Sequence, residues 1–215
     1  MTWFLDHIPE VLDLTYRHVY LAGLPLLLGL LIALPLGWLA RRYRPLYLPF
    51  TAGFGLLYTI PSLALFILMP GFLGRQILDP VNVIVAMTIY TVALLVRTVA
   101  DGLAAVPDHV NNAATAMGYG RGKRFFAVEL PLAVPVISAG LRVAAVSNVS
   151  IVSVGAIIGV QQLGMLFTDG FYRFFYDPII VGVVGCILLA LVFDLVIVGV
   201  TRVLTPWLRA SGGHP

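Results

Sequence analysis

The sequence predicts an all-α, polytopic membrane protein, and two observations predict it: the composition and the long apolar segments. Hydrophobic residues make up 60% of the 215 residues and charged residues 11%, against roughly 45–50% and about 25% in soluble domains. A soluble globule of this length has too little interior to bury that excess. Five apolar segments of about 20 residues fit in the chain with loops between them. The composition excludes a soluble enzyme, a disordered region and a disulfide-stabilised secreted domain.

The charge and the cysteine content limit the partners. The net charge of +3 at pH 7 is too small to indicate a nucleic-acid ligand. Cys186 is the single cysteine and lies in an apolar run, so no internal disulfide can form. We therefore expect the surface to meet a lipid bilayer and no nucleic acid.

Windows without charged residues place the membrane helices. Residues 19–40, 46–69, 80–96 and 143–168 contain no Asp, Glu, Lys or Arg, and residues 178–201 contain only Asp194. Allowing one turn at either end, we expect helices at about 19–40, 48–69, 81–100, 133–158 and 179–203.

The fourth segment differs from the others in length. The apolar region from Leu130 to Thr168 is too long for one straight crossing. A break near Gly155 or Gly159 would divide it into a helix and a re-entrant piece. A sixth crossing is the alternative.

The distribution of basic residues orients the chain. Nine of them follow the first, third and fifth expected helices, and three lie in the alternate loops. By the positive-inside bias the N-terminus is outside and the C-terminus is cytoplasmic, which requires an odd number of crossings and fits five. We expect an extracytoplasmic segment at 1–18, a transmembrane domain at 19–204 and a cytoplasmic tail at 205–215, in a cell (inner or plasma) membrane. The nine are Arg41, Arg42, Arg44, Arg97, Arg121, Lys123, Arg124, Arg202 and Arg209, and the three are Arg17, Arg75 and Arg173.

Residues 101–131 form a long, patterned cytoplasmic loop between the third and fourth helices. Pro107 precedes a short expected helix from Asp108 to Met117, which Gly118 ends. A second short helix, at about 122–129, is expected to end before Pro131. These helices and a basic cluster fit a docking surface as well as they fit a solvated loop that carries the positive-inside charges.

A motif in this loop resembles that of a known family. Permease subunits of ATP-driven, binding-protein-dependent importers share the pattern E-A-A-x(3)-G-x(9)-I-x-L-P. The sequence matches this spacing with Asn112-Ala113-Ala114, Gly118 and Val128-Glu129-Leu130-Pro131. Thr59-Ile60-Pro61-Ser62-Leu63-Ala64-Leu65, residues 128–140 and Gly140-Leu141-Arg142 are similar to the branch that imports glycine betaine, choline, carnitine and related osmoprotectants. The resemblance extends from Leu24 to Leu204.

The resemblance implies a fold, partners and a role for the loop. It implies the permease fold of type I ATP-binding cassette (ABC) importers, with the loop helices as the coupling elements that an ABC ATPase moves. ATP and Mg²⁺ would bind to that ATPase, so the chain itself would be no enzyme and need no cofactor. A second permease copy or a similar permease, and a separate extracytoplasmic solute-binding protein, are the other implied partners. The implied coupling residues are Asn112, Ala113, Ala114, Gly118, Arg121, Leu130 and Pro131.

Two departures from the family pattern stand out. Asn112 replaces the usual Glu, so a charged contact with the ATPase is absent or moved. Gly159-Val160-Gln161-Gln162-Leu163-Gly164 replaces a more glycine-rich stretch, which leaves the conformation of the outer loop open.

Other chemistry has little support in the sequence. The stretch from Gly118 to Lys123 lacks the glycine and the Ser or Thr that a phosphate-binding loop requires. Asp194 alone supplies no intramembrane protease site. We expect no metal site, because the histidines show no ligand spacing; they are His7, His18, His109 and His214.

Charged residues near or within the membrane favour local pairing. Arg97 and Asp101 are one helical turn apart and fit an ion pair. Asp194 lies deeper, and pairing with Arg142 or Arg97 is favoured over a proton relay.

Polar and aromatic residues of helices two to four are candidates for the solute pathway. In membrane helices such residues more often join helices by hydrogen bonds, so both roles stay open. A quaternary ammonium ion would depend on aromatic faces for recognition. The candidates are Tyr58, Pro61, Ser62, Tyr90, Ser147, Asn148, Ser150 and Ser153.

The sequence as a whole indicates an osmoprotectant importer permease that works by alternating access. An importer of the same architecture for another solute, such as an amino acid, and a non-transporting membrane scaffold are the alternatives.

Overall fold

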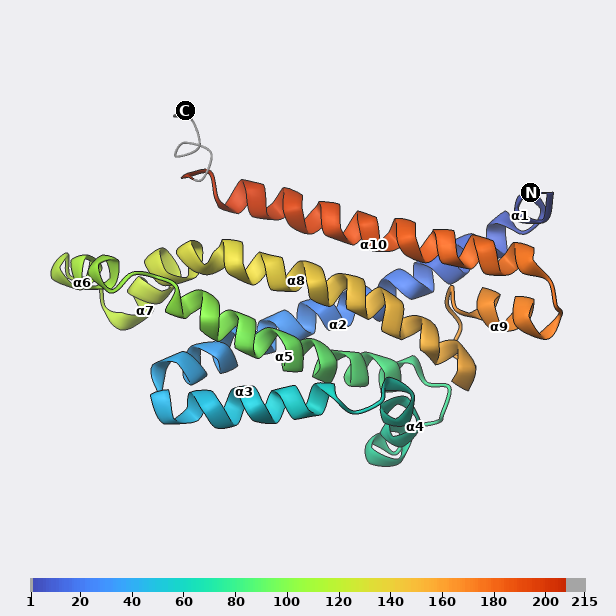
Figure 1. Cartoon of the computed structure of the whole chain (residues 1–215), viewed down its shortest axis with the longest axis horizontal. Helices are drawn as coiled ribbons and strands as arrows, with labels where there is room; N and C mark the ends of the chain where they lie inside the picture. The colour runs from blue at the N-terminus through green and yellow to red at the C-terminus, as the bar shows by residue number, and fades with distance from the viewer. Residues whose placement is uncertain (1, 208–215) are drawn as a thin grey trace.

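The computed structural model describes residues 2–207, and every regular element in that range is helical. Four long elements run roughly along the long axis of the molecule (Figure 1). They are α2 (Ile8–Arg42), α5 (Pro80–Ala104), α8 (Leu130–Ser153) and α10 (Tyr176–Leu204). The shorter helices are α1 (Thr2–Asp6), α3 (Arg44–Tyr58), α4 (Ser62–Leu73), α6 (Asp108–Ala116), α7 (Arg121–Arg124) and α9 (Met165–Tyr172).

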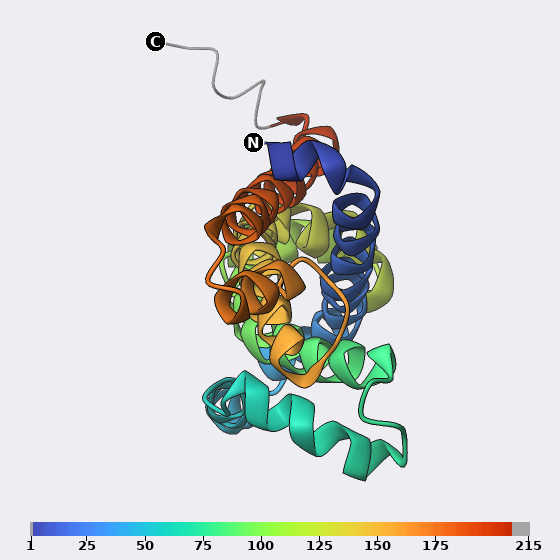
Figure 2. The same cartoon turned by 90° about the vertical axis from the view of Figure 1, so that its right-hand side faces the viewer.

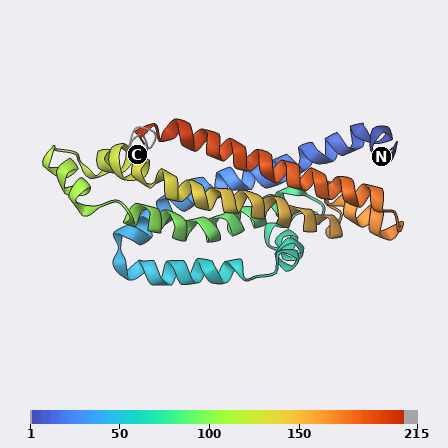
Figure 3. The same cartoon turned by 45° about the horizontal axis from the view of Figure 1, so that its top comes forward.

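Viewed from one end, α3 and α4 lie at one edge of the bundle and α10 at the opposite edge (Figure 2). In another view α10 passes over α2 at an angle (Figure 3). The corner between α2 and α3, the helices α6 and α7, and the end of α10 gather at one end of the molecule (Figure 1). Helix α9, α4 and the N-terminal end of α2 lie at the other.

The first long helix begins earlier than the sequence predicted. Helix α2 starts at Ile8 rather than near residue 19, so the predicted extracytoplasmic segment 1–18 is largely helical. Charged residues before the predicted span lie on the exposed face of this helix, where Asp13 pairs with Arg17 at 2.7 Å. The opposite face is buried at Val11, Leu14, His18, Leu21 and Ala22, with helical spacing.

The second predicted span, 48–69, is wrong as a single helix. The chain bends by 98° between α3 and α4. Pro61 explains the break, because it has no N–H to donate and disfavours helical geometry at Ile60. The Tyr90 hydroxyl donates a hydrogen bond to the freed Ile60 carbonyl.

Four helices are long and apolar enough to cross a membrane: Ile8–Arg42, Pro80–Ala104, Arg121–Ile158 and Tyr176–Leu204. The bent pair α3–α4 makes a fifth if it counts as one broken span. Within residues 2–207 the structure thus has four unbroken candidate spans, and it reaches the five predicted crossings only when the bent pair is counted as one span.

Both ends of the fourth span carry a local change of helix type. As predicted, the region breaks at Gly159, whose φ of 86° ends the 3₁₀ turn Val154–Ile158, and the short helix α9 follows. The expected stop before Pro131 is wrong, because the helix runs on from Arg121 through the π-helical segment Phe125–Glu129 into α8. There the Leu130 N–H donates to the Phe125 carbonyl five residues back. This wider turn accommodates Pro131, which has no N–H to donate to Ala127.

Small residues let α2 and α5 approach closely. Gly29, Ala33 and Gly37 are buried at four-residue intervals on α2. A Cβ at Gly37 would lie 2.6 Å from the Val99 Cβ and 2.9 Å from the Val96 carbonyl oxygen. The backbone oxygen cannot move aside cheaply, so the site admits only glycine.

We expect Gly37→Leu to lower the stability of the folded chain by about 1–3 kcal/mol, the usual cost of overpacking a core. Thermal unfolding in detergent would measure the loss. Gly55→Leu is the matched control, because a Cβ at Gly55 meets nothing within 4 Å. Equal melting temperatures for the two variants would contradict the close α2–α5 contact.

Candidate functional site

The patterned loop folds into a helix with a defined stop. Helix α6 begins after Pro107 and ends at Ala116, one residue short of the predicted end. The Gly118 N–H donates to the Thr115 carbonyl at 3.0 Å and the Tyr119 N–H to the Ala114 carbonyl at 3.1 Å. Gly118 has a φ of 81°. These bonds form a Schellman motif, which requires the left-handed conformation that glycine adopts without strain.

A charged side chain ties α6 to the chain that follows it. Arg124 donates from Nη1 to the Thr115 hydroxyl at 2.9 Å and from Nε to Glu129 Oε1 at 2.7 Å. Thr115 in turn donates to the Asn111 carbonyl at 2.8 Å. Arg121, one of the implied coupling residues, starts α7 and is exposed. Helix α6 is therefore held in a fixed orientation on α7 and the π-helical segment.

The two motif alanines face opposite ways. Ala114 is 1% exposed and packs against its own chain, whereas Asn112 and Ala113 are exposed. Met117 and Phe126, at 69% and 70% exposure, add apolar surface nearby. The face of α6 open to a partner thus carries Ala113 and Asn112, and of the two alanines predicted to meet the ATPase only Ala113 lies on the surface.

The loop is connected to two long helices. Leu130 and Pro131 form the first turn of α8, so the π-helical segment leads directly into that helix. The Phe125 ring packs edge-on against Trp38 of α2, with centroids 6.2 Å apart. A displacement of α6 would therefore reach both α8 and α2.

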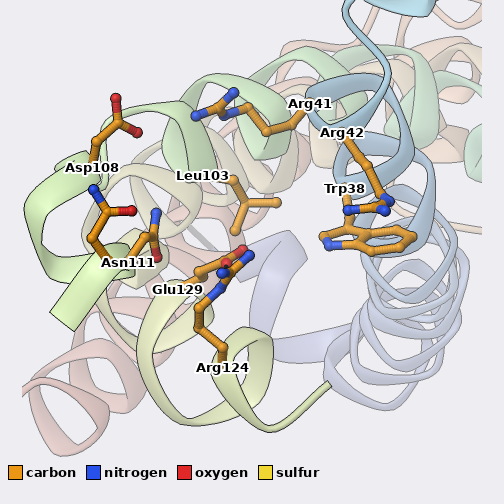
Figure 4. A pocket seen from close by; sticks show the side chains of 9 residues that line it. Trp38, Arg41, Arg42, Leu103, Asp108, Asn111, Arg124 and Glu129 are labelled. Atoms are coloured by element: carbon orange, nitrogen blue, oxygen red, sulfur yellow. Dashed lines mark hydrogen bonds and ion pairs between the residues drawn. The ribbon is translucent and has the colours of Figure 1, made fainter. Parts of the chain in front are cut away.

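A cleft of about 280 Å³ separates the end of α2 from the loop (Figure 4). Figure 4 shows the Arg42 side chain beside the Trp38 ring and the Arg124 side chain beside Glu129. The cleft is lined by Trp38, Arg41, Arg42, Leu103, Asp108, Asn111, Asn112, Arg124 and Glu129.

The pathway candidates do not form one cluster. Tyr58 and Tyr90 lie together, edge to face with centroids 5.6 Å apart, beside the α3–α4 break. Pro61 precedes α4 and Ser62 is its first residue. On α8, Ser147 is partly buried, Ser150 is exposed, and the Ser153 hydroxyl donates to the Ser150 carbonyl at 2.6 Å.

Asn148 joins three helices. Its side chain is 2% exposed, and Nδ2 donates to the Thr91 hydroxyl of α5 at 3.0 Å and to the Ala22 carbonyl of α2 at 3.3 Å. This placement fits the helix-joining role that the sequence left open. Thr91 was missed, because nothing in the sequence pairs it with a residue of another helix.

Gln162 orders the outer loop that departs from the family pattern. It is fully buried, its Nε2 donates to the Ser153 carbonyl at 3.2 Å, and its Oε1 accepts from the Gly164 N–H at 2.5 Å. His18, also fully buried, lies with a ring nitrogen 3.0 Å from the Val149 carbonyl. Both residues were missed as structural elements, although the glutamine in place of glycine was a visible signal.

The predicted ion pairs form. Asp194 accepts from Arg142 through both oxygens, at 2.5 Å from Nε and 2.9 Å from Nη2. Arg97 lies 3.5 Å from Asp101, which also accepts from the Tyr47 hydroxyl at 2.6 Å. In residues 2–207 no group of three His, Cys, Asp or Glu side chains is placed to hold a metal ion.

Comparison with known proteins places this arrangement among transport proteins. The family described as "Binding-protein-dependent transport system inner membrane component" matches residues 26–210. The osmoprotectant import permease protein OsmW of Salmonella typhimurium is 34% identical over 207 residues, covering 95% of this chain and 96% of its own. The glycine betaine/carnitine/choline transport system permease protein OpuCD of Bacillus subtilis is 30% identical and covers 98% and 91%.

Solved structures show the same fold. A chain of the inward-facing MetNI methionine ABC transporter has a TM-score of 0.83 at 21% identity and covers 93% of this chain and 98% of its own. A chain of an amino acid ABC transporter has a TM-score of 0.72 at 16% identity and covers 94% and 97%. At these identities the likeness describes the fold alone.

Proposed function

The chain belongs to the family of binding-protein-dependent transport system inner membrane components, and we propose that it is the permease subunit of an ABC importer of osmoprotectants. The observation that carries the proposal is the rigid, exposed helix α6, which stands at the motif position where the family contacts its ATPase. Relatives whose names include osmoprotectant, glycine betaine, carnitine and choline support the solute class.

Helix α6 would transmit the motion of a partner ATPase. The partner binds ATP with Mg²⁺ and hydrolyses the ATP. This chain supplies the docking face for that partner at Asn112 and Ala113. Because Arg124 fixes α6 to the start of α8, and Phe125 contacts Trp38 of α2, closure of the ATPase would move both long helices together. Alternating access to a central pathway is the consequence.

We assign the outer end of that pathway to the α3–α4 break. A broken helix leaves backbone groups free to meet a solute, and Tyr58 and Tyr90 place aromatic rings beside the break. Ser62 and Pro61 lie at the same point, while Ser147, Ser150 and Ser153 follow one another on α8. The aromatic rings suit a quaternary ammonium ion, which cannot donate a hydrogen bond.

Tyr58→Ala should therefore lower the uptake of glycine betaine by about threefold to thirtyfold, the range of one cation–π contact, without lowering the amount of folded protein. Tyr58→Phe keeps the ring and should transport normally. Initial uptake rates per folded molecule would measure the effect, and equal rates for Tyr58→Ala and the parent chain would contradict this assignment.

The orientation follows from the end at which the basic residues gather. Arg41, Arg42, Arg121 and Arg124 belong to the end that carries α6 (Figure 1). With that end cytoplasmic, α9 and the start of α2 face the exterior, where a solute-binding protein would dock. A second permease, identical or similar, would complete the pathway. The predicted tail 205–215 lies mostly outside the described residues.

Reconstitution tests the proposal. The chain would be placed in liposomes with its ATPase and binding protein, and ATP-dependent uptake of labelled glycine betaine, choline and methionine would be compared. We expect uptake of glycine betaine or choline that requires ATP and the binding protein. Uptake of methionine alone would show that the solute is an amino acid and not an osmoprotectant. Passage of a labelled solute without ATP would contradict an ATP-driven importer.

A further inference from the structure

The cleft between the end of α2 and the loop that joins α5 to α8 is lined by three arginines but only two carboxylates (Figure 4). We propose that this cleft binds the headgroup of an anionic glycerophospholipid, a phosphodiester with a single negative charge, from the cytoplasmic leaflet. The proposal goes beyond solute transport. It uses the orientation given above but no property of the transported solute.

The depth of the cleft suits a lipid headgroup. The uncharged part of α2, residues 19–40, spans about 33 Å, close to the thickness of the hydrocarbon layer. Arg41 and Arg42 follow immediately, and α3 starts back toward the bilayer at Arg44. Trp38 lies one turn before them, as tryptophan does at membrane interfaces. The α2–α3 corner therefore lies at the level of the lipid phosphates.

Two of the three arginines in the cleft lack an acidic partner. Arg124 is paired with Glu129 at 2.7 Å. Arg42 lies over the rings of Trp38 and Tyr43, 5.7 and 5.6 Å from their centroids. Arg41 is partly buried and makes no hydrogen bond or ion pair with the described side chains and backbone. A partly buried guanidinium without a partner is costly, and a phosphate oxygen offers the acceptor it needs.

The charge of the lining selects the kind of headgroup. Three arginines against Asp108 and Glu129 leave one net positive charge, which one phosphodiester neutralises. A zwitterionic headgroup would leave that charge in place, and a more highly charged free phosphate would meet the Asp108 carboxylate. Asn111 lines the same cleft, and its Oδ1 is buried with no partner in the described part of the chain. A hydroxyl of a glycerol headgroup can donate to that oxygen.

Native mass spectrometry of the full chain in mild detergent, titrated with phosphatidylglycerol, tests the proposal. We expect one phosphatidylglycerol to be retained in preference to phosphatidylethanolamine and phosphatidylcholine. Arg41→Gln should weaken retention about fivefold, the effect of one basic residue on an anionic lipid, and Arg41→Gln with Arg42→Gln should weaken it further. Arg121→Gln is the matched control, since Arg121 is exposed on the same loop but does not line the cleft.

A competition experiment and two more variants distinguish a lipid phosphate from free phosphate and control for misfolding. Inorganic phosphate at millimolar concentration should not displace the lipid, and Asp108→Asn, which removes a negative charge, should retain phosphatidylglycerol at least as well as the parent chain. Arg41→Lys keeps the charge and should retain more lipid than Arg41→Gln at equal helical content. Equal loss in Arg121→Gln, preference for phosphatidylethanolamine, weaker retention in Asp108→Asn, or displacement by phosphate would each overturn the proposal.

Discussion

Gly118→Val is expected to lower ATP-driven uptake about tenfold while the chain still inserts and folds in the membrane. The φ of 81° at Gly118 costs a β-branched residue about 1–2 kcal/mol, so the population with the Schellman turn formed falls accordingly. Without that turn the Tyr119 N–H no longer meets the Ala114 carbonyl, and α6 loses its fixed orientation. Uptake per folded molecule in proteoliposomes would measure the loss.

The expected loss comes from the backbone conformation at position 118 and not from a steric clash of the new side chain. A Cβ at Gly118 meets nothing within 4 Å, so there is room for a side chain. Gly118→Asn is the control, because asparagine adopts the left-handed conformation more readily than other side chains. We expect it to keep most of the uptake. Equal activity of the valine and asparagine variants would show that the turn plays no part in coupling.

Arg142→Leu should reduce the amount of folded chain in the membrane about tenfold, because it leaves the Asp194 carboxylate without its partner within a membrane span. Arg142 lies near the centre of α8, and Asp194 lies in the second half of α10. Detergent-resistant, monodisperse protein recovered from equal cell mass would measure the effect.

Two further variants separate pairing from proton transfer. Arg142→Leu with Asp194→Leu removes both charges and should recover much of the folded protein, since the unpaired carboxylate is then gone. Asp194→Asn should reduce the yield less than Arg142→Leu, and its uptake per folded molecule should stay near that of the parent chain. Normal folding with abolished transport in Asp194→Asn would instead favour the proton relay.

Hydropathy and local start and stop signals predicted much of the helical layout. Span five was expected at 179–203 and is Tyr176–Leu204, and span three was expected at 81–100 and is Pro80–Ala104. Helix α6 begins at the predicted Asp108, because Pro107 is a local signal. A window average cannot show that charges at the start of α2 lie on one exposed face, and so residues 8–18 were not predicted as helix.

Pro61 and Pro131 each lack the N–H that a helix would use at their positions. The break at Pro61 and the π-helical turn before Pro131 depend on how neighbouring groups compensate for that missing donor. The partner of the Ile60 carbonyl is Tyr90, 30 residues away, and no local pattern indicates it. The sequence predicted short helices between the third and fourth spans, where α6 and α7 lie, and their role in coupling stays a prediction. The burial of Ala114 and the hydrogen bond between Arg124 and Thr115 were not predicted, because both depend on residues that only the folded structure brings together.

Site-specific photo-crosslinking from the surface of α6 tests the central claim most directly. A benzophenone amino acid would replace Ala113 in membranes that contain the assembled transporter, and Tyr16, 73% exposed at the other end of α2, would be the control position. We predict an adduct with the ATPase subunit from position 113 whose yield changes when ATP is added, and none from position 16. An ATPase adduct from position 16, or none from position 113 in a transporter that is active, would contradict the assignment of α6 as the coupling helix.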